Sequence, residues 1–137
     1  MARLCACTNC QLHLIHPLGF ELDDRRLRRA GLDYWPYLNV REHANWQKAR
    51  DYLGGYRRWF ALSTKGENSL WDARFQPGDV LVFGSETTGL PPEIREELVD
   101  IRIPLRQEVP VRSLNLSTAT GIAVYEALRQ CEPADFK

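Results

Sequence analysis

The segment Phe83–Pro91 (FGSETTGLP) follows directly on the apolar run Asp79–Phe83 (DVLVF), and these two pieces decide the fold. A short apolar run bounded by glycine and proline is typical of a buried strand. Trp59–Ser63 (WFALS) is a second such run, and Asp100–Ile103 (DIRI) is a third predicted strand. Because WFALS and DVLVF are apolar on both faces, they predict a parallel sheet with helices on both faces.

The segments around these runs carry helix signals. Leu114–Gln130 is the longest predicted helix, and Ala44–Leu53 is a second that ends at Gly54-Gly55. A third begins at Pro91-Pro92 and is predicted to run to about Val99. With short predicted strands at Gln11–Ile15 and Asn39–Val40, strands alternate with helices, which indicates an α/β fold.

Three loops follow the carboxyl ends of the predicted strands, where open parallel sheets bind their ligands. They are Ser63–Gly66, Gly84–Pro91 and the loop from Pro104 to Ser113–Ser117. Glycines let a backbone approach a ligand closely, and a helix start offers free N–H groups, so these loops fit a polar molecule of adenosine size. Neither GxGxxG nor GxxxxGK[ST] occurs in the sequence, which argues against hydride or phosphoryl transfer.

Taken together, FGSETTGLP (83–91), IRIPL (101–105) and VRSLNLSTATGIAVYEALRQ (111–130) closely resemble the SPOUT RNA methyltransferases. The nearest match is the TrmL/YibK branch, which methylates the ribose 2′-hydroxyl of the tRNA wobble nucleotide. RLCACTNCQLHLIHPLGF (3–20) and RRLRRAGLDYW (25–35) resemble the N-terminal part of that branch. The resemblance implies a single domain over residues 1–137 and a deep C-terminal trefoil knot, a rare exception among folds. It also implies S-adenosylmethionine as cofactor, tRNA as partner and a homodimer.

The resemblance also implies roles for individual residues. It places cofactor contacts at Leu62, Gly84, Glu86, Ile103, Ser113, Leu114 and Leu116. It places Arg3, Ser113 and Asn115 near the methyl-transfer centre and Tyr125 at the dimer interface. Arg3 would lie near the target ribose, where it either helps to activate the hydroxyl or binds the adjacent phosphate.

Two departures from the family pattern affect these expectations. Family members begin with a strand and a Pro-x-Asn-x-Gly loop before the arginine, whereas only Met1-Ala2 precede Arg3 here. The resemblance therefore implies that the first strand is missing. An alternative function is then a non-catalytic or weakly active RNA-binding dimer that retains cofactor binding. The second departure is the loop Arg106–Val111, which is slightly longer than usual.

The formal net charge is zero, but its distribution is uneven. Residues 1–65 hold 11 Lys or Arg and 6 Asp or Glu, whereas residues 66–137 hold 7 and 12. The basic cluster Arg25, Arg26, Arg28 and Arg29 is therefore a candidate for binding RNA phosphates, the alternative being a solvated helix face. Tyr34, Trp35 and Tyr37 either stack on an unpaired base or pack in the protein.

Metal and membrane binding are not expected. Cys5, Cys7, Cys10, His13 and His16 do not have the spacing of a zinc site, so these cysteines are expected to be buried, reduced thiols. The three histidines are expected to be structural or surface residues, and Trp46, Trp59 and Trp71 are expected to be structural. No apolar run approaches the roughly 20 residues that span a bilayer, and a cytoplasmic protein is expected.

Overall fold

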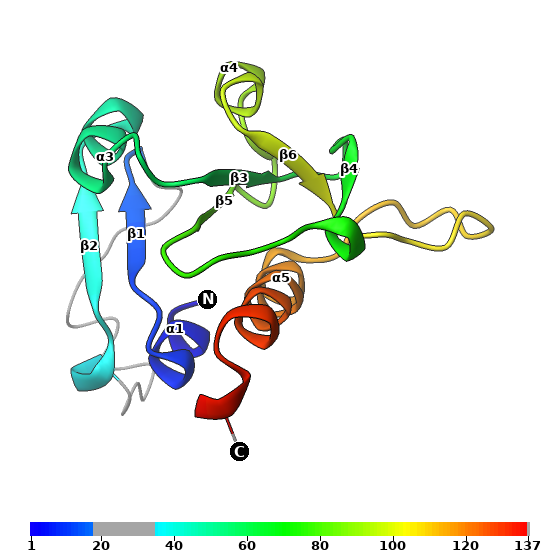
Figure 1. Cartoon of the computed structure of the whole chain (residues 1–137). Coiled ribbons are helices and arrows are strands. Elements are labelled where there is room, and N and C mark those ends of the chain that lie inside the picture. The colour runs from blue at the N-terminus through cyan, green and yellow to red at the C-terminus, as the bar shows by residue number, and fades with distance from the viewer. Residues whose placement is uncertain (18–34, 137) are drawn as a thin grey trace. The chain divides into compact units, whose positions relative to one another are not determined.

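The computed structural model describes residues 1–17 and 35–136. The chain forms two compact units, Met1–Gly55 and Tyr56–Lys137, which are described separately below (Figure 1). The four candidate RNA-binding residues Arg25, Arg26, Arg28 and Arg29, and also Tyr34, lie outside the described residues. That residues 1–137 form a single domain stays a prediction, because compact units of this kind can belong to one domain or to two.

Residues 1–17 and 35–55 of the first unit form a pair of parallel strands and two helices. Its elements are α1 (Ala2–Thr8), β1 (Leu12–Ile15), the 3₁₀ turn Trp35–Tyr37, β2 (Val40–His43) and α3 (Trp46–Leu53). Strands β1 and β2 pair in parallel, with Leu12 opposite Val40, and α3 packs on both strands. The side chain of Asn45 caps α3 by accepting a hydrogen bond from the N–H of Lys48, and the helix ends at Gly54 as predicted.

Helix α1 was not predicted from the sequence. It is short, and its apolar residues do not form the periodic stripe by which a helix is recognised. It ends because Asn9 adopts a left-handed backbone conformation (φ 55°, ψ 27°), which asparagine tolerates better than most residues.

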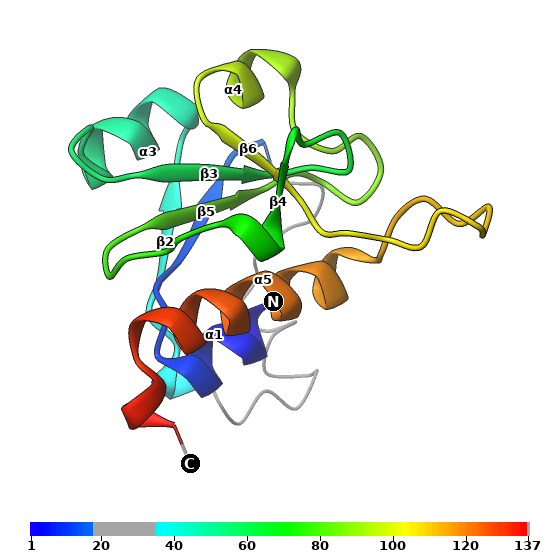
Figure 2. The same ribbon diagram turned by 45° about the vertical axis from the view of Figure 1, so that its right-hand side comes forward.

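The second unit contains a four-stranded parallel sheet with the strand order β4-β6-β3-β5. Its elements in chain order are β3 (Trp59–Leu62), β4 (Asn68–Ser69), the 3₁₀ turn Leu70–Asp72, β5 (Val80–Phe83), α4 (Pro92–Glu96), β6 (Val99–Arg102), α5 (Leu116–Cys131) and the 3₁₀ turn Pro133–Asp135. Helix α4 packs on β6 and α5 on β5, on opposite sides of the strands (Figure 2). The predicted α/β fold with a parallel sheet and helices on both faces is confirmed.

Several predicted boundaries differ from the structure. The helix predicted from Ala44 begins at Trp46, the strand predicted at Asn39–Val40 is Val40–His43, and the helix predicted at Leu114–Gln130 is Leu116–Cys131. Helix α4 ends at Glu96 rather than near Val99, and Val99 is the first residue of β6. Val99 pairs with Phe60 of β3, so strand pairing overrides the local helix signal there.

The core of the second unit lies between the sheet and α5. Its buried residues come from the sheet, the segment before β5 and the helix, and they are Phe60, Leu62, Leu70, Phe75, Ile101 and Ala123. Phe60 and Phe75 meet edge to face at 5.1 Å between ring centroids. Ala123 is fully buried, so its small side chain lets α5 approach the core closely.

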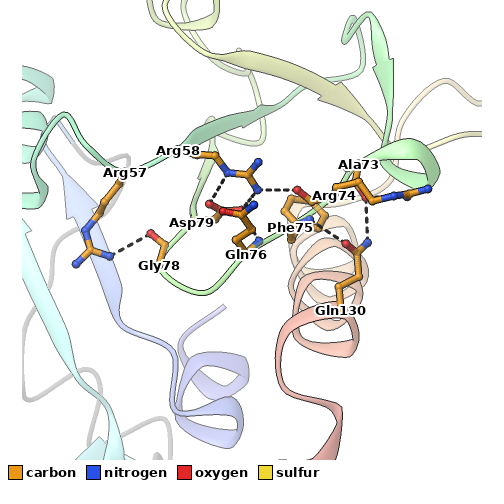
Figure 3. A network of polar contacts seen from close by, with 9 residues as sticks. All are labelled: Arg57, Arg58, Ala73, Arg74, Phe75, Gln76, Gly78, Asp79 and Gln130. Carbon is orange, nitrogen blue, oxygen red and sulfur yellow. Dashed lines mark hydrogen bonds and ion pairs between the residues drawn. The ribbon is translucent and has the colours of Figure 1, made fainter.

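The segment between the turn at Leu70–Asp72 and β5 is held to the sheet by Arg58 (Figure 3). The guanidinium of Arg58 donates from Nε to Oδ1 of Asp79 at 3.0 Å and from Nη2 to Oδ2 at 2.6 Å. Oδ2 of Asp79 also accepts from the N–H of Gln76 at 2.8 Å, and Nη2 of Arg58 donates to the carbonyl of Arg74. These two charged side chains therefore fix the chain just before β5 against the start of β3.

Gln130 of α5 holds the same segment from the helix side (Figure 3). Its Nε2 donates to the carbonyl of Ala73 at 3.0 Å, and its Oε1 accepts from the N–H of Phe75 at 2.8 Å. Gln130 also donates to Oε1 of Glu126, which accepts from Arg129 as well. The amide of Gln130 thus links the helix to two backbone groups of the segment.

Glu126 makes the stability of the second unit dependent on pH. The hydrogen bonds from Arg129 and Gln130 lower the pKa of Glu126 from 4.5 to about 2. A carboxyl with a lowered folded-state pKa contributes stability above its unfolded pKa and loses it as the pH falls from about 4.5 to about 2. Because Arg129 is largely exposed, we expect the contribution to be about 1 kcal/mol. Urea unfolding between pH 2 and pH 6 should show this loss in the wild type and not in Glu126→Gln. Glu108→Gln, in an exposed loop, is the control, and a wild-type profile for Glu126→Gln would contradict the assignment.

Several expectations about cysteine, histidine and tryptophan residues can now be compared with the structure. The prediction of buried thiols holds for Cys5 but is wrong for Cys7, which is exposed; Cys10 and Cys131 are half-buried. His13 Nδ1 and His43 Nε2 lie 2.9 Å apart, in a structural contact between β1 and β2. The structural assignment is wrong for Trp71, because its side chain is 73% exposed.

The described ranges 1–17 and 35–136 contain neither a candidate metal cluster nor a candidate membrane span. No group of three or more His, Cys, Asp or Glu side chains there could hold a metal ion. No helix in these ranges is long and apolar enough to cross a membrane.

Candidate functional site

Three loops leave the same edge of the four-stranded sheet. Strand β3 lies between β5 and β6, and all three run in parallel, so their carboxyl ends are neighbours. Leu62, the buried last residue of β3, is opposite Phe83 of β5 and Ile101 of β6. The predicted clustering of the loops after these strands is therefore confirmed for the second unit.

The first loop, Ser63–Glu67, lies directly on the backbone of β6. The N–H of Ser63 donates to the carbonyl of Ile101 at 2.9 Å, and the loop closes with a bond from the N–H of Gly66 to the carbonyl of Ser63. A Cβ atom on Gly66 would lie 2.3 Å from the carbonyl carbon of Ile101. Only glycine therefore allows the loop to pass this close to the strand.

Two arginines hold the first loop in place. Arg102 of β6 donates from Nη1 to the carbonyls of Gly66 and Glu67 at 3.0 and 2.7 Å. Arg95 of α4 reaches the carbonyl of Lys65 at 3.4 Å and forms an ion pair with Oδ2 of Asp100 at 2.5 Å. The hydrogen bond with Asp100 raises the pKa of Arg95, which is a cation in any case.

The sequence interpretation missed both arginines. Their hydrogen bonds go to backbone carbonyls some 30 residues away in the chain, and such bonds leave no local pattern. In the sequence, the one feature that could have pointed to them was Arg102, a charged residue between the two isoleucines of the predicted strand IRI (101–103).

The second loop, Gly84–Pro91, is a turn closed on itself. The N–H of Gly89 donates to the carbonyl of Ser85 at 3.0 Å, and the hydroxyls of Ser85 and Thr88 lie 2.7 Å apart. A Cβ on Gly84 would lie 2.1 Å from the carbonyl carbon of Gly89, and Gly89 itself has a φ of +68°. Glu86 is exposed at the tip of this turn. The two glycines shape the loop, and its outer surface is left for a ligand.

The third loop runs from β6 to α5, and it and the start of α5 contain five of the predicted cofactor and transfer-centre residues. Ile103 is half-buried against the core, whereas Ser113 and Leu114 are exposed, Leu114 by 37%. Oδ1 of Asn115 accepts from the N–H of Thr118 at 2.8 Å and so caps α5. The cap uses one lone pair of Oδ1, so the amide nitrogen, which can only donate, and the second lone pair of Oδ1 remain for a substrate. Leu116 begins the helix and is half-buried.

The remaining predicted residues lie elsewhere. Arg3 is exposed in the first turn of α1 and belongs to the first unit. Tyr125 is 50% exposed on α5. Together with Leu70, Trp71, Ile122, Glu126 and Arg129 it lines an open cavity of about 390 Å³. Leu62, Gly84, Glu86, Ile103, Ser113, Leu114, Asn115 and Leu116 all belong to the second unit, at the ends of its parallel strands, in the loops that follow them or at the start of α5, while Tyr125 lies further along α5.

The parallel sheet of the second unit thus carries two glycine-shaped loops at neighbouring strand ends, and a third loop leads from β6 into α5. The model of the SpoU rRNA Methylase family matches residues 1–125, and the chain belongs to this family.

Two curated relatives define the branch more narrowly. The chain is 50% identical over 131 residues to the tRNA (cytidine(34)-2'-O)-methyltransferase of Methylovorus glucosotrophus, covering 93% of this chain and 83% of the relative. It is 52% identical over 131 residues to the protein of the same name from Saccharophagus degradans, with the same coverage.

Solved structures agree with this placement. One, from work on the 2-OH methylation of C/U34 on tRNA, is 48% identical with a TM-score of 0.87 and covers 94% of this chain and 84% of that one. A putative RNA methyltransferase from Bacillus anthracis is 40% identical with a TM-score of 0.86, covering 94% and 82%. An AdoMet-bound rRNA methyltransferase from Sinorhizobium meliloti is 25% identical with a TM-score of 0.77, covering 93% and 49%.

Proposed function

We propose that this protein transfers the methyl group of S-adenosylmethionine to the ribose 2′-hydroxyl of the wobble nucleotide, a cytidine or modified uridine, in the tRNA anticodon loop. The observation that carries the proposal is the identity of about 50% to tRNA (cytidine(34)-2'-O)-methyltransferases, which extends over both units. The solved structure concerned with C/U34 of tRNA, at 48% identity, supports the same substrate.

The loops at the sheet edge fit the cofactor. Leu114 offers an exposed apolar side chain, and Leu116 and Ile103 are half-buried, so these three residues could supply the apolar surface that an adenine ring needs. Leu62 and Gly84 would contribute backbone groups, and Glu86 lies at the rim of the second loop. The AdoMet-bound relative from Sinorhizobium meliloti supports this choice.

Methyl transfer requires the protein mainly to align the ribose hydroxyl with the methyl group. S-adenosylmethionine, when bound, supplies a methyl group that is already activated by the sulfonium. The ribose hydroxyl is a poor nucleophile and must be held in line with the bond that breaks. The hydroxyl of Ser113 and the amide nitrogen of Asn115 can hold polar groups near the transfer centre, since both lie just before α5. Arg3 orients the ribose or its phosphate from α1.

The chain outside the pocket has its own proposed roles. We infer that the chain after DVLVFG (79–84) forms a deep C-terminal trefoil knot and that both units act as one methyltransferase domain. The basic cluster Arg25, Arg26, Arg28 and Arg29 would bind tRNA phosphates. We place the protein in the cytoplasm, with its tRNA.

A homodimer through α5 completes the proposal. Tyr125, Ile122 and Trp71 are exposed large apolar side chains around one open cavity. A second copy of α5 would cover them, and a contiguous apolar surface of this kind is typical of an interface. The molecular mass in solution, measured by sedimentation, tests this assembly.

Two measurements on the purified chain test the proposed function. We expect calorimetry to detect binding of S-adenosylhomocysteine, and we expect methyl transfer to unmodified tRNA whose product maps to nucleotide 34. The control is the same tRNA with a 2′-deoxyribose at position 34, which has no acceptor hydroxyl. Absence of cofactor binding would contradict the pocket, whereas binding without transfer would favour the weakly active alternative.

A further inference from the structure

The C-terminal end of α1 brings Cys5 and Cys10 together. After the left-handed residue Asn9, the N–H of Cys10 donates to the carbonyl of Cys5 at 3.0 Å, and the N–H of Asn9 donates to the same carbonyl. A backbone hydrogen bond from the sixth residue to the carbonyl of the first, with a left-handed residue at the fifth position, defines a Schellman motif. In this motif the side chains at the positions of Cys5 and Cys10 commonly pack on each other.

The backbone geometry permits a disulfide between these two residues. With standard bond lengths, the 3.0 Å hydrogen bond keeps the two Cα atoms within about 7 Å of each other. Disulfides join Cα atoms that lie about 4.4 to 6.8 Å apart. Burial raises the pKa of the Cys5 thiol, and the charge on Cys10 raises it further. Both residues are free thiols in this structure.

Cys7 is the alternative partner for Cys10, because the two form a C-x-x-C sequence. Residues two apart on a helix point to different sides, so Cys5 and Cys7 cannot both face Cys10. Cys5 is buried, whereas Cys7 is exposed. The motif that closes the helix therefore pairs Cys10 with Cys5 and leaves Cys7 pointing to solvent.

We propose that Cys5 and Cys10 form a reversible intramolecular disulfide when the protein meets a low-molecular-weight disulfide such as oxidised glutathione. The thiolate of the half-buried Cys10 attacks one sulfur of the oxidant, forms a mixed disulfide and releases one small thiol. The thiolate of Cys5 then attacks the sulfur of Cys10 and releases the second small thiol. The protein loses two electrons and two protons, and the oxidant gains them. The bridge would lock the C-terminal end of α1, the helix whose first turn carries Arg3.

Peptide mapping after oxidation tests this pairing. The native protein is incubated with oxidised glutathione and a metal chelator, free thiols are alkylated, and the tryptic peptide that follows Arg3 is sequenced by mass spectrometry. We expect the number of alkylated cysteines to fall from four to two, with Cys7 and Cys131 labelled and a reducible bridge between Cys5 and Cys10. A bridge between Cys7 and Cys10, a glutathione retained on either of them, or four labelled cysteines would overturn the proposal.

Matched variants complete the test. In Cys7→Ser, we expect oxidation still to lower the number of alkylated cysteines by two. In Cys10→Ser, we expect no internal bridge and therefore no such decrease. Circular dichroism of both reduced variants checks that they fold, and the wild-type map alone decides the pairing if one does not. The readout does not depend on methyl transfer, so the result is independent of the proposed function.

Discussion

Gly84→Ala is expected to destabilise the second unit by about 3 kcal/mol and to weaken binding of S-adenosylhomocysteine at least tenfold. The reason is steric: the new Cβ would lie 2.1 Å from the carbonyl carbon of Gly89 and 2.2 Å from the N of Leu90. Both obstacles are backbone, so neither can rotate away, and the turn Gly84–Pro91 must open. Urea unfolding measures the first effect, and calorimetry on the folded fraction measures the second.

Two other glycines supply graded controls for this effect. Gly89→Ala meets no atom within 4 Å but would strain a residue with a φ of +68°, so we expect a loss of about 1 kcal/mol. Gly55→Ala also meets no atom within 4 Å and is expected to behave as the wild type in both assays. Equal losses in Gly84→Ala and Gly55→Ala would show that the close approach of the two backbones does not hold the loop.

Much of the second unit was predictable because its strands are marked by composition alone. The runs at 59–63 and 79–83 are apolar on both faces, and such runs occur where helices cover both sides of a sheet. The loops that follow them could be assigned as a candidate site because glycines, prolines and a helix start are local signals. The strand order β4-β6-β3-β5 had no such signal. It follows from packing between segments that are far apart in the chain.

The features that were missed are those that exist only through tertiary contacts. Strand β4 has just two polar residues, Asn68 and Ser69, and is a strand only because it pairs with β6. Arg95 and Arg102 act on backbone carbonyls of the first loop, which any loop sequence would present. Asn115 was assigned to the transfer centre from the resemblance, but its cap on α5 was recognised only from the hydrogen bond to Thr118.

Arg3→Ala is expected to lower kcat/KM for methyl transfer to tRNA at least 100-fold, while binding of S-adenosylhomocysteine stays within about twofold of the wild type. Arg3 is exposed on α1, so its removal leaves no cavity, and α1 should stay folded because alanine is the best helix former. Lys48→Ala removes one exposed positive charge from the same unit and is the control for a general loss of attraction to tRNA. An equal decrease of kcat/KM in the two variants would contradict the placement of Arg3 near the transfer centre.

Arg3→Lys separates the two roles that the sequence left open for this side chain. A lysine keeps the positive charge but not the planar fork of five donors. If Arg3 binds the phosphate beside the target ribose, Arg3→Lys should retain kcat and raise KM by less than about tenfold, because an ammonium also binds phosphate. If Arg3 instead orients the 2′-hydroxyl in the transfer step, Arg3→Lys should lose kcat nearly as fully as Arg3→Ala, since that role needs the geometry of the guanidinium. Steady-state kinetics with saturating cofactor distinguish these results, because phosphate binding stabilises substrate and transition state alike whereas orientation acts on the transition state.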